Sequence, residues 1–169
     1  GQGSQAVGML ADVESVSKET FSEASSVLGY DLWNLIANGP EDQLNQTEYT
    51  QPALLTCSIA LYRLALAKGL PTPDVVAGHS LGEYSALVAA EVLQFSDAVS
   101  LVQQRGRFMQ SAVPIGEGGM AAIMGLSDEE VREACSEAAG GEIVQAANYN
   151  APGQVVIAGS TAAVERGID

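Results

Sequence analysis

The sequence from Asp74 to Gly82 reads Asp-Val-Val-Ala-Gly-His-Ser-Leu-Gly, and it decides the expected fold. Its first half, Val75 to Ala77, is a short apolar run with two β-branched residues, which is typical of a buried parallel strand. The residues from Ser80 to about Ala90 follow a helical pattern. A strand that turns sharply into a helix predicts a parallel α/β core with this turn at one end of its sheet.

The turn from Gly78 to Gly82 matches the G-x-S-x-G pattern of a nucleophile elbow. The glycines are expected on both sides of the serine because the sharp turn leaves no room for side chains there. The positive end of the following helix favours an oxyanion at this place. Ser80 is therefore the candidate nucleophile, and the backbone N–H of Leu81 is a candidate oxyanion donor. The alternative is an ordinary strand–helix connection in which Ser80 caps the helix, with Glu83 completing a capping box.

A serine nucleophile needs a general base, and His79 is the only histidine in the chain. Neighbouring side chains at an elbow point in different directions, so His79 is badly placed to take the Ser80 proton. A packed or hydrogen-bonded structural histidine is the better interpretation, and we expect the base to come from outside these residues. A single histidine also excludes most His-rich metal sites, so no metal ion is expected.

Both ends of the sequence look interrupted. Residues 1–5 read as a loop without an initiator Met, and residues 164–169 break off in a helical pattern. We expect a longer parent protein; the alternative is a disordered start and a naturally short last helix. Gln2 and Gln5, with their flanking glycines, are candidates for a second backbone donor to an oxyanion, and a plain turn is the alternative.

Arg105 is a candidate for binding an acidic group. It lies with Arg107 in a helical stretch that is otherwise poor in charge, and the whole chain has only seven basic residues. A guanidinium can grip a carboxylate in two-point geometry. The alternative is an ordinary arginine on the helix surface.

The residues around the elbow predict a helical environment. The region 30–50 is expected to be loop-rich with short helical turns. A long helix is expected to start at Pro52, since proline suits a first turn, and to stop at Gly69. Apolar residues on nearly every side of this helix predict that it is largely buried. Two further helices are expected, over 16–28 with Gly29 as its stop and over 96–111.

A second part is expected after a linker at Pro114–Gly119. Its pattern is strand, helix, strand, strand, helix, which is a ferredoxin-like unit missing its final strand. The expected elements are a strand over 120–124, a helix from the capping box Ser127–Glu130 to Ala139, a strand over 142–149, a turn over 150–153, a strand over 155–158 and a last helix capped by Ser160. The chain is therefore divided into residues 1–113, part of the α/β core, and 114–169, a partial ferredoxin-like subdomain.

Composition excludes several classes of protein. The 169 residues carry 21 acidic and seven basic side chains, for a net charge of −14, which excludes an ordinary nucleic-acid binder and disfavours docking on an anionic membrane. No apolar run is long enough for a membrane-spanning helix. Two cysteines, Cys57 and Cys135, are too few for a disulfide framework, so a reduced cytoplasmic setting is expected.

Five stretches together carry a family resemblance. In chain order they are residues 1–5, Gln51-Pro52-Ala53, the elbow with its continuation to Ala86, Arg105 to Met109, and Asn148 to Gln154. The chain resembles the malonyl-CoA:acyl-carrier-protein transacylases of bacterial fatty acid synthesis over its full length. Polyketide synthase acyltransferase domains share the same scheme and are the nearest alternative.

The resemblance implies a hydrolase-like parallel α/β core with a ferredoxin-like insertion, in a parent that is monomeric. Ser80 would carry the malonyl group as an ester, and Gln2 and Leu81 would supply the backbone oxyanion hole. Arg105 would pair with the malonyl carboxylate, while Asn150 and His79 would line the cleft. The substrate would be malonyl-CoA, with no cofactor, and the partner would be acyl carrier protein. No residue of this chain matches the base histidine of the family.

Two other interpretations stay open at this point. A serine hydrolase or thioesterase would use the same elbow with water as the acceptor, although an esterase for neutral esters has no use for a carboxylate-binding Arg105. The third interpretation is an inactive segment, since we expect the 169 residues alone to turn over slowly or not at all. An acidic carrier protein would also be repelled at long range by a net charge of −14, so docking would need a local patch.

Overall fold

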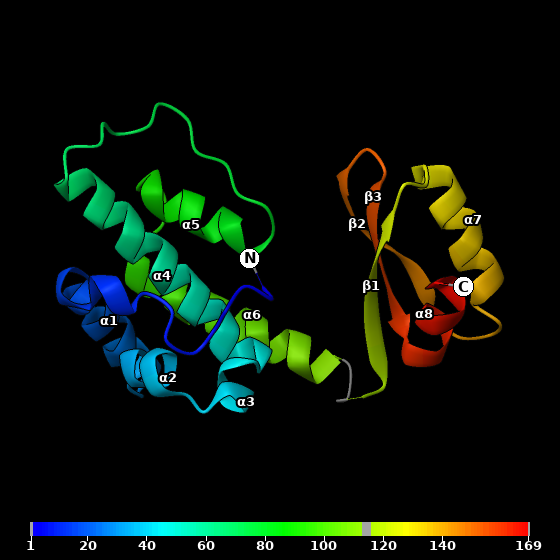
Figure 1. The fold of residues 1–169 in the computed structure, drawn as a ribbon, viewed down its shortest axis with the longest axis horizontal. Coiled ribbons are helices and arrows are strands. Elements are labelled where there is room, and N and C mark those ends of the chain that lie inside the picture. The colour runs from blue at the N-terminus through cyan, green and yellow to red at the C-terminus, as the bar shows by residue number, and fades with distance from the viewer. Residues whose placement is uncertain (1, 113–115, 169) are drawn as a thin grey trace. The chain divides into compact units, whose positions relative to one another are not determined.

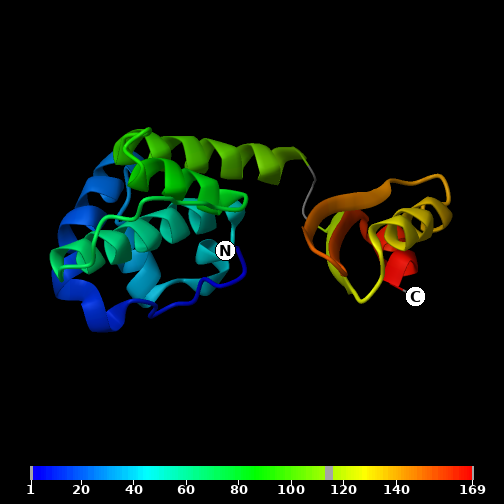
Figure 2. The same ribbon diagram turned by 90° about the horizontal axis from the view of Figure 1, so that it is seen from above.

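The computed structural model describes residues 2–112 and 116–168, and the side chains of residues 13–17 are left out of the description. The chain forms two compact units, residues 1–111 and 112–169, each with its own apolar core (Figures 1 and 2). The boundary expected at 113/114 and the start of the expected Pro114–Gly119 linker lie outside the described residues. Each unit is considered by itself below.

The first unit consists of helices packed around one long central helix, α4. Helices α1 and α5 both pack against α4, and the short helices α2 and α3 close one end. Its core contains the fully buried side chains of Phe21, Leu32, Leu55 and Val99. The helices are η1 (Ala11–Val13), α1 (Glu14–Leu28), α2 (Leu32–Asn38), α3 (Glu41–Leu44), α4 (Thr47–Ala67), α5 (Leu81–Ala89) and α6 (Phe95–Ala112).

Helix α4 begins at Thr47, so the start expected at Pro52 is wrong by five residues. Proline inside a helix removes only the hydrogen bond to the carbonyl four residues before it, which here belongs to Glu48 in the first turn. The Thr50 hydroxyl adds two bonds in this turn, donating to the carbonyls of Leu44 (2.6 Å) and Gln46 (3.0 Å). The expected burial holds for the first half of the helix, whereas Leu61 in the second half is 44% exposed.

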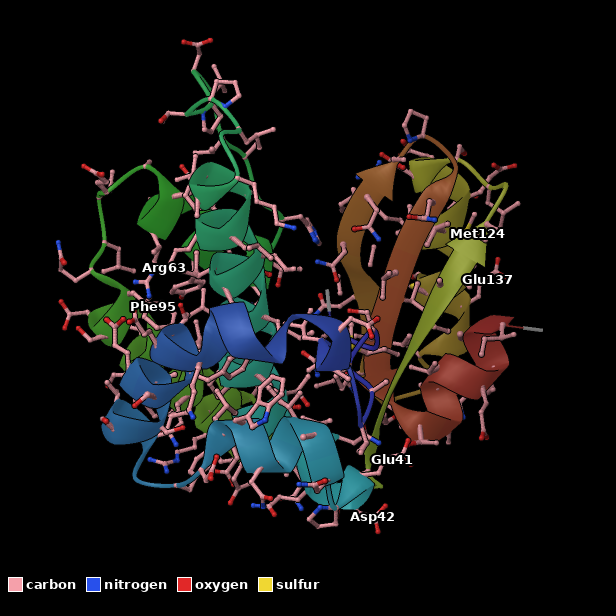
Figure 3. The ribbon with its side chains drawn as sticks, turned by 60° about the vertical axis from the view of Figure 1, so that its left-hand side comes forward. Glu41, Asp42, Arg63, Phe95, Met124 and Glu137 are labelled. Atoms are coloured by element: carbon pink, nitrogen blue, oxygen red, sulfur yellow. The ribbon has the colours of Figure 1, made fainter. Side chains whose placement is uncertain are left out.

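Arg63 ties three helices of this unit together. Its guanidinium, on α4, donates to Thr20 and Glu23 on α1, both at 3.0 Å. The same group lies 4.8 Å from the centre of the Phe95 ring at the start of α6, where the aromatic face attracts the cation (Figure 3). These contacts hold α1 and α6 against the central helix.

The strand expected over residues 74–78 is not formed. The segment between α4 and α5 is an extended loop (Figure 1), and the Val75 side chain is 84% exposed. A strand needs a neighbour to accept and donate its backbone hydrogen bonds, and the described residues of this unit contain no other strand. The β-branched sequence alone therefore leaves these residues extended but unpaired.

The second unit is a three-stranded antiparallel sheet covered on one face by two helices. The strand order is β1-β3-β2, and α7 and α8 pack on the same face of the sheet (Figures 1 and 2). This arrangement confirms the expected strand, helix, strand, strand, helix order of a ferredoxin-like unit. The elements are β1 (Gly118–Met124), α7 (Asp128–Ala138), β2 (Val144–Ala151), β3 (Gln154–Ser160) and α8 (Thr161–Ile168).

Local signals in this unit are mostly confirmed. The capping box is present: Ser127 Oγ accepts from the Glu130 amide, and the Glu130 carboxylate accepts from the Ser127 amide at 2.7 Å. The turn between β2 and β3 is shorter than expected, because β2 extends to Ala151 and only Pro152 and Gly153 form the turn. Asn150 is consequently part of the strand, in a register shift between Tyr149 and Ala151.

Candidate active site

Ser80 occupies a strained backbone position at the start of α5. Its φ is +54° and its ψ is −115°, a left-handed conformation that is unfavourable for any residue with a Cβ. Its side chain makes no capping hydrogen bond to the helix, so the alternative of a helix-capping serine is wrong. The exposed hydroxyl instead accepts a hydrogen bond from Arg105 Nη2 at 2.9 Å. Strain at this position presents the hydroxyl to another side chain.

Gly78 makes the sharp turn possible. A Cβ at this position would overlap the carbonyl group of Gly82 and the Glu83 amide, which are backbone atoms of the following helix. The expectation of crowding on both sides of the serine is correct only here, because a Cβ at Gly82 would meet nothing within 4 Å. One glycine is required by the space and the other is not.

Leu81 is the first residue of α5, and its side chain is buried (6% exposed). The next two amides are used, since Gly82 donates to the His79 carbonyl (2.9 Å) and Glu83 donates to the Ser80 carbonyl (3.1 Å). A residue at the first helical position has no acceptor within its own helix for its amide. The Leu81 N–H thus has the position expected of an oxyanion donor, beside Ser80 and at the positive end of α5.

Arg105 reaches Ser80 from α6 and is held on its other side by Gln51 of α4. Arg105 Nη1 donates to Gln51 Oε1 at 2.8 Å, while Nη2 donates to the Ser80 hydroxyl. The two helices approach closely at Gly106, where a Cβ would come within 2.6 Å of the Glu48 Cα. The small residue next to Arg105 therefore lets α6 lie against the start of α4.

Gln51 is a site residue that sequence reasoning did not identify. Its side chain is 0% exposed, and it was expected only near a helix cap. The signal that points to it is a polar residue in an otherwise apolar helix, since an amide must find hydrogen-bond partners when it is buried. Its partners lie more than fifty residues further along the chain, so the sequence does not disclose them.

The charge of Arg105 is not balanced by a carboxylate. Among residues 2–112 and 116–168, every other arginine forms a salt bridge with a glutamate, and Arg105 has only the neutral partners Gln51 and Ser80. The four salt bridges are Arg63–Glu23 (3.0 Å), Arg107–Glu48 (3.1 Å), Arg132–Glu129 (3.0 Å) and Arg166–Glu142 (2.7 Å). In a chain with three times as many acidic as basic residues, this leaves one positive group facing the nucleophile.

The other predicted site residues have different placements. Gln2 Nε2 donates to Thr47 Oγ1 at 3.2 Å, one helical turn from Gln51, so the first residues contact the same end of α4. His79 is exposed, and the recorded hydrogen bond at this residue is made by its carbonyl. Asn150 belongs to the second unit and stays a prediction. In the described part of the chain, the only recorded partner of the Ser80 hydroxyl is Arg105.

The remaining reactive groups do not compete with Ser80. Both cysteines are free and buried, and burial raises the pKa of the Cys57 thiol to about 12, so it stays protonated near neutral pH. Burial also raises the pKa of Cys135. Within the described ranges, no three His, Cys, Asp or Glu side chains cluster to hold a metal ion. The described helices are also too short or too polar to cross a membrane.

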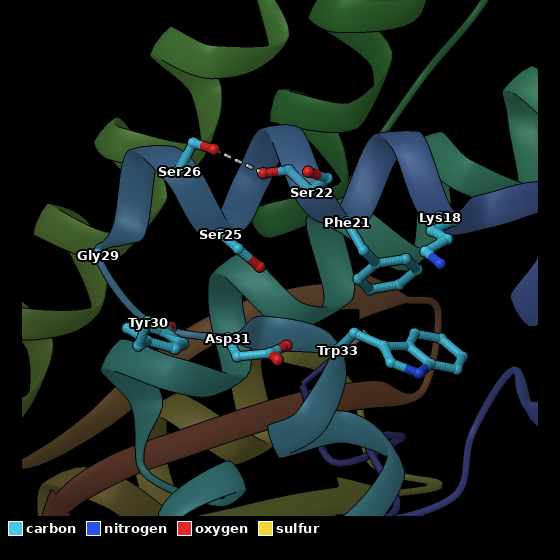
Figure 4. Close-up of a pocket in the computed structure, with 9 residues that line it drawn as sticks. All are labelled: Lys18, Phe21, Ser22, Ser25, Ser26, Gly29, Tyr30, Asp31 and Trp33. Carbon is cyan, nitrogen blue, oxygen red and sulfur yellow. Dashed lines mark hydrogen bonds between the residues drawn. The ribbon is translucent and has the colours of Figure 1, made fainter.

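A hollow of about 540 Å³ in the first unit is separate from this site (Figure 4). Its polar side chains already serve the backbone: Asp31 accepts from the Asn34 amide at 2.8 Å, Ser25 accepts from the Leu32 amide at 3.0 Å, and Ser26 donates to the Ser22 carbonyl at 2.9 Å. Trp33 packs edge-on against Phe21 in its wall. The lining residues do not include Ser80, Arg105 or Gln51.

An exposed serine at a strained strand-to-helix-type turn, with a free helix N-terminus and a fixed guanidinium beside it, is an arrangement suited to acyl transfer through a serine ester. The chain belongs to the family described as the acyl transferase domain, which matches residues 1–169. This result confirms the α/β class of the fold.

Individual relatives share one printed name. The chain is 60% identical to the malonyl CoA-acyl carrier protein transacylase of Escherichia coli K12 and 48% identical to that of Bacillus subtilis, each over 98% of this chain. It spans about half the length of these curated relatives, 55% and 53% respectively. Its fold is similar to the transacylase structure from Coxiella burnetii, with a TM-score of 0.94 and 53% identity over 99% of this chain and 54% of that one. A malonyl-transacylase solved with a type II acyl-carrier protein is similar too, with a TM-score of 0.92 and 56% identity over 99% of this chain and 55% of that one.

Proposed function

We propose that this chain carries the nucleophile and the acid-binding side of a malonyl-CoA:acyl-carrier-protein transacylase of fatty acid synthesis. One observation carries the proposal: Arg105, whose charge no carboxylate balances, lies 2.9 Å from the Ser80 hydroxyl. A malonyl ester on Ser80 would hold its free carboxylate only two carbon atoms beyond the ester oxygen. The guanidinium is therefore within reach of that carboxylate and has no competing acidic partner.

The reaction would proceed in two acyl-transfer steps. Ser80 Oγ attacks the thioester carbonyl of malonyl-CoA, a C–O bond forms, and the C–S bond breaks to release coenzyme A. The thiol of the pantetheine arm on acyl carrier protein then attacks the malonyl ester and regenerates the Ser80 hydroxyl. The Leu81 and Gln2 amides would bind the oxyanion of each tetrahedral intermediate, and Asn150 and His79 would line the cleft. The general base would be a histidine outside these 169 residues.

Arg105 would select and orient the acyl group. A two-point guanidinium–carboxylate contact fixes the plane of the malonyl carboxylate and thereby the direction of its carbonyl. A serine hydrolase for neutral esters has no such requirement, and an uncompensated cation beside the nucleophile favours the transferase. Acyl carrier protein is the proposed partner, with two buried free cysteines supporting a cytoplasmic setting.

The test is covalent labelling of a full-length protein that contains this chain. With radiolabelled malonyl-CoA and an acid quench, we expect protein-bound label in the wild type and none in Ser80→Ala. Arg105→Ala should lower the ratio of malonyl to acetyl kcat/KM about ten- to a hundredfold, because a carboxylate loses its charged partner. Equal labelling of Ser80→Ala would overturn the nucleophile. Release of free malonate in place of transfer to a carrier thiol would favour the hydrolase.

A further inference from the structure

The buried amide of Gln51 is used at both ends. Its Oε1 accepts from Arg105 Nη1 at 2.8 Å, and its Nε2 donates to the Met109 sulfur at 3.0 Å. The orientation of the amide is fixed by chemistry, since a guanidinium only donates and must therefore face the oxygen. Because the side chain is 0% exposed, water cannot replace either partner. Gln51 therefore fixes where the guanidinium of Arg105 lies.

The neutrality of Gln51 matters as much as its position. A glutamate here would accept the same hydrogen bond from Arg105, as Glu48 does from Arg107 at 3.1 Å. It would also cancel the charge of the guanidinium in a place shielded from solvent, where opposite charges interact strongly. In the described residues, the arginine held by an amide is the one that faces the nucleophile, whereas the other four are held by glutamates.

From these contacts we propose that Gln51 is a specificity-determining positioning residue, which aims Arg105 at the acyl group on Ser80 while leaving its positive charge available. The proposal rests on the proposed function, in which that acyl group carries a carboxylate. Selection for an acidic acyl group then depends on two properties of residue 51, an acceptor atom for Nη1 and the absence of negative charge.

Two substitutions separate these two properties. Gln51→Glu keeps the acceptor and adds the charge, whereas Gln51→Leu removes the acceptor and stays neutral. In a full-length protein that contains this chain, kcat and KM would be measured with malonyl-CoA and acetyl-CoA. Gln51→Glu should lower the malonyl-to-acetyl ratio of kcat/KM about ten- to a hundredfold, through malonyl alone. Gln51→Leu should raise KM for malonyl-CoA and lower the ratio by less, because the charge remains but its direction is lost.

The matched control is Gln104→Glu, which makes the same change of charge at an exposed position of α6. It should leave the ratio unchanged, and the melting temperatures of all variants show whether each protein is folded. A purely structural Gln51 would lower transfer of both acyl groups equally in both variants, and that result would overturn the inference. An unchanged ratio in Gln51→Glu would overturn it as well. If Arg105→Ala also leaves the ratio unchanged, the proposed function itself fails; if Arg105→Ala lowers it, only the role of Gln51 is lost.

Discussion

At the scale of single residues, the site depends on two positions that tolerate few side chains. Ser80 is held at a positive φ, and Gly78 allows the chain to turn tightly enough to produce it. Because strain of this kind persists only where the surrounding structure imposes it, the elbow depends on the packing of α5 behind it. The consequence can be tested at Gly78, which takes no part in the chemistry.

Gly78→Ala should damage the site by displacing α5. The added methyl group would overlap the Gly82 carbonyl, and backbone atoms can yield only by moving the helix. We expect a loss of about 1 to 3 kcal/mol in the free energy of unfolding, measured in urea. Labelling of Ser80 in a full-length protein should fall roughly a hundredfold, because small displacements of a nucleophile are costly.

The matched control for this substitution is Gly82→Ala. A Cβ at Gly82 meets nothing within 4 Å, and alanine is the better helix former, so the free energy of unfolding should be equal or higher by up to about 1 kcal/mol. If Gly78→Ala were as stable as Gly82→Ala and labelled at the wild-type rate, the crowding at the turn would not have the importance given to it here.

Residue-level patterns explain why part of the site could be predicted. The elbow is local, so Gly78, Ser80 and Leu81 could be identified from five consecutive residues and the helical pattern after them. The contact between Gln51 and Arg105 joins residues 54 positions apart, and it depends on how closely α6 approaches α4 at Gly106. No local pattern encodes that approach, so Arg105 was a candidate from its charge while its partner was missed.

At the scale of elements, short-range signals were reliable where the chain supplied its own partners. The capping box at Ser127 and the strand order of the second unit followed from spacing, because each hydrogen bond is made within the unit. The strand expected over 74–78 failed for the opposite reason, since its ladder partners are not among the described residues. The start of α4 was missed because Pro52 was taken as a boundary, although burial and the Thr50 bonds favour an earlier start.

Ser127→Ala should destabilise the second unit by weakening the start of α7. Loss of a serine N-cap costs about 1 kcal/mol, which urea unfolding followed by circular dichroism would detect. An unchanged midpoint would mean that α7 does not need its cap. A substitution at Ser136, an exposed serine in the middle of α7, is the control, and Ser136→Ala should be neutral or slightly stabilising.

The contribution of this cap should also depend on pH. Hydrogen bonds from the Ser127 hydroxyl and amide hold the pKa of Glu130 below its ordinary value of 4.5. A lowered folded-state pKa means that the stabilisation is complete above about pH 4.5 and is lost as the pH falls toward the lowered pKa. The stability difference between wild type and Ser127→Ala should therefore be smaller near pH 3 than at pH 7.

At the scale of the whole molecule, two separate cores predict two separately destabilised units. Ile157 is 1% exposed in the core of the second unit, so Ile157→Ala should cost that unit about 2 to 5 kcal/mol. Hydrogen exchange read by mass spectrometry should then speed up in peptides from residues 118–168 and stay unchanged in those from α1 and α4. Equal acceleration in both sets would mean that the chain unfolds as one cooperative body.

The contact between Trp33 and Phe21 has an optical consequence. Trp33 is the only tryptophan of the chain, and its ring centre lies 4.9 Å from that of Phe21, between α2 and α1. Tryptophan emission from this chain therefore reports on the α1–α2 contact in the first unit and carries no signal from a tryptophan in the second. Fluorescence follows the unit that holds the nucleophile, and a label placed in residues 118–168 would give the other unit a colour of its own.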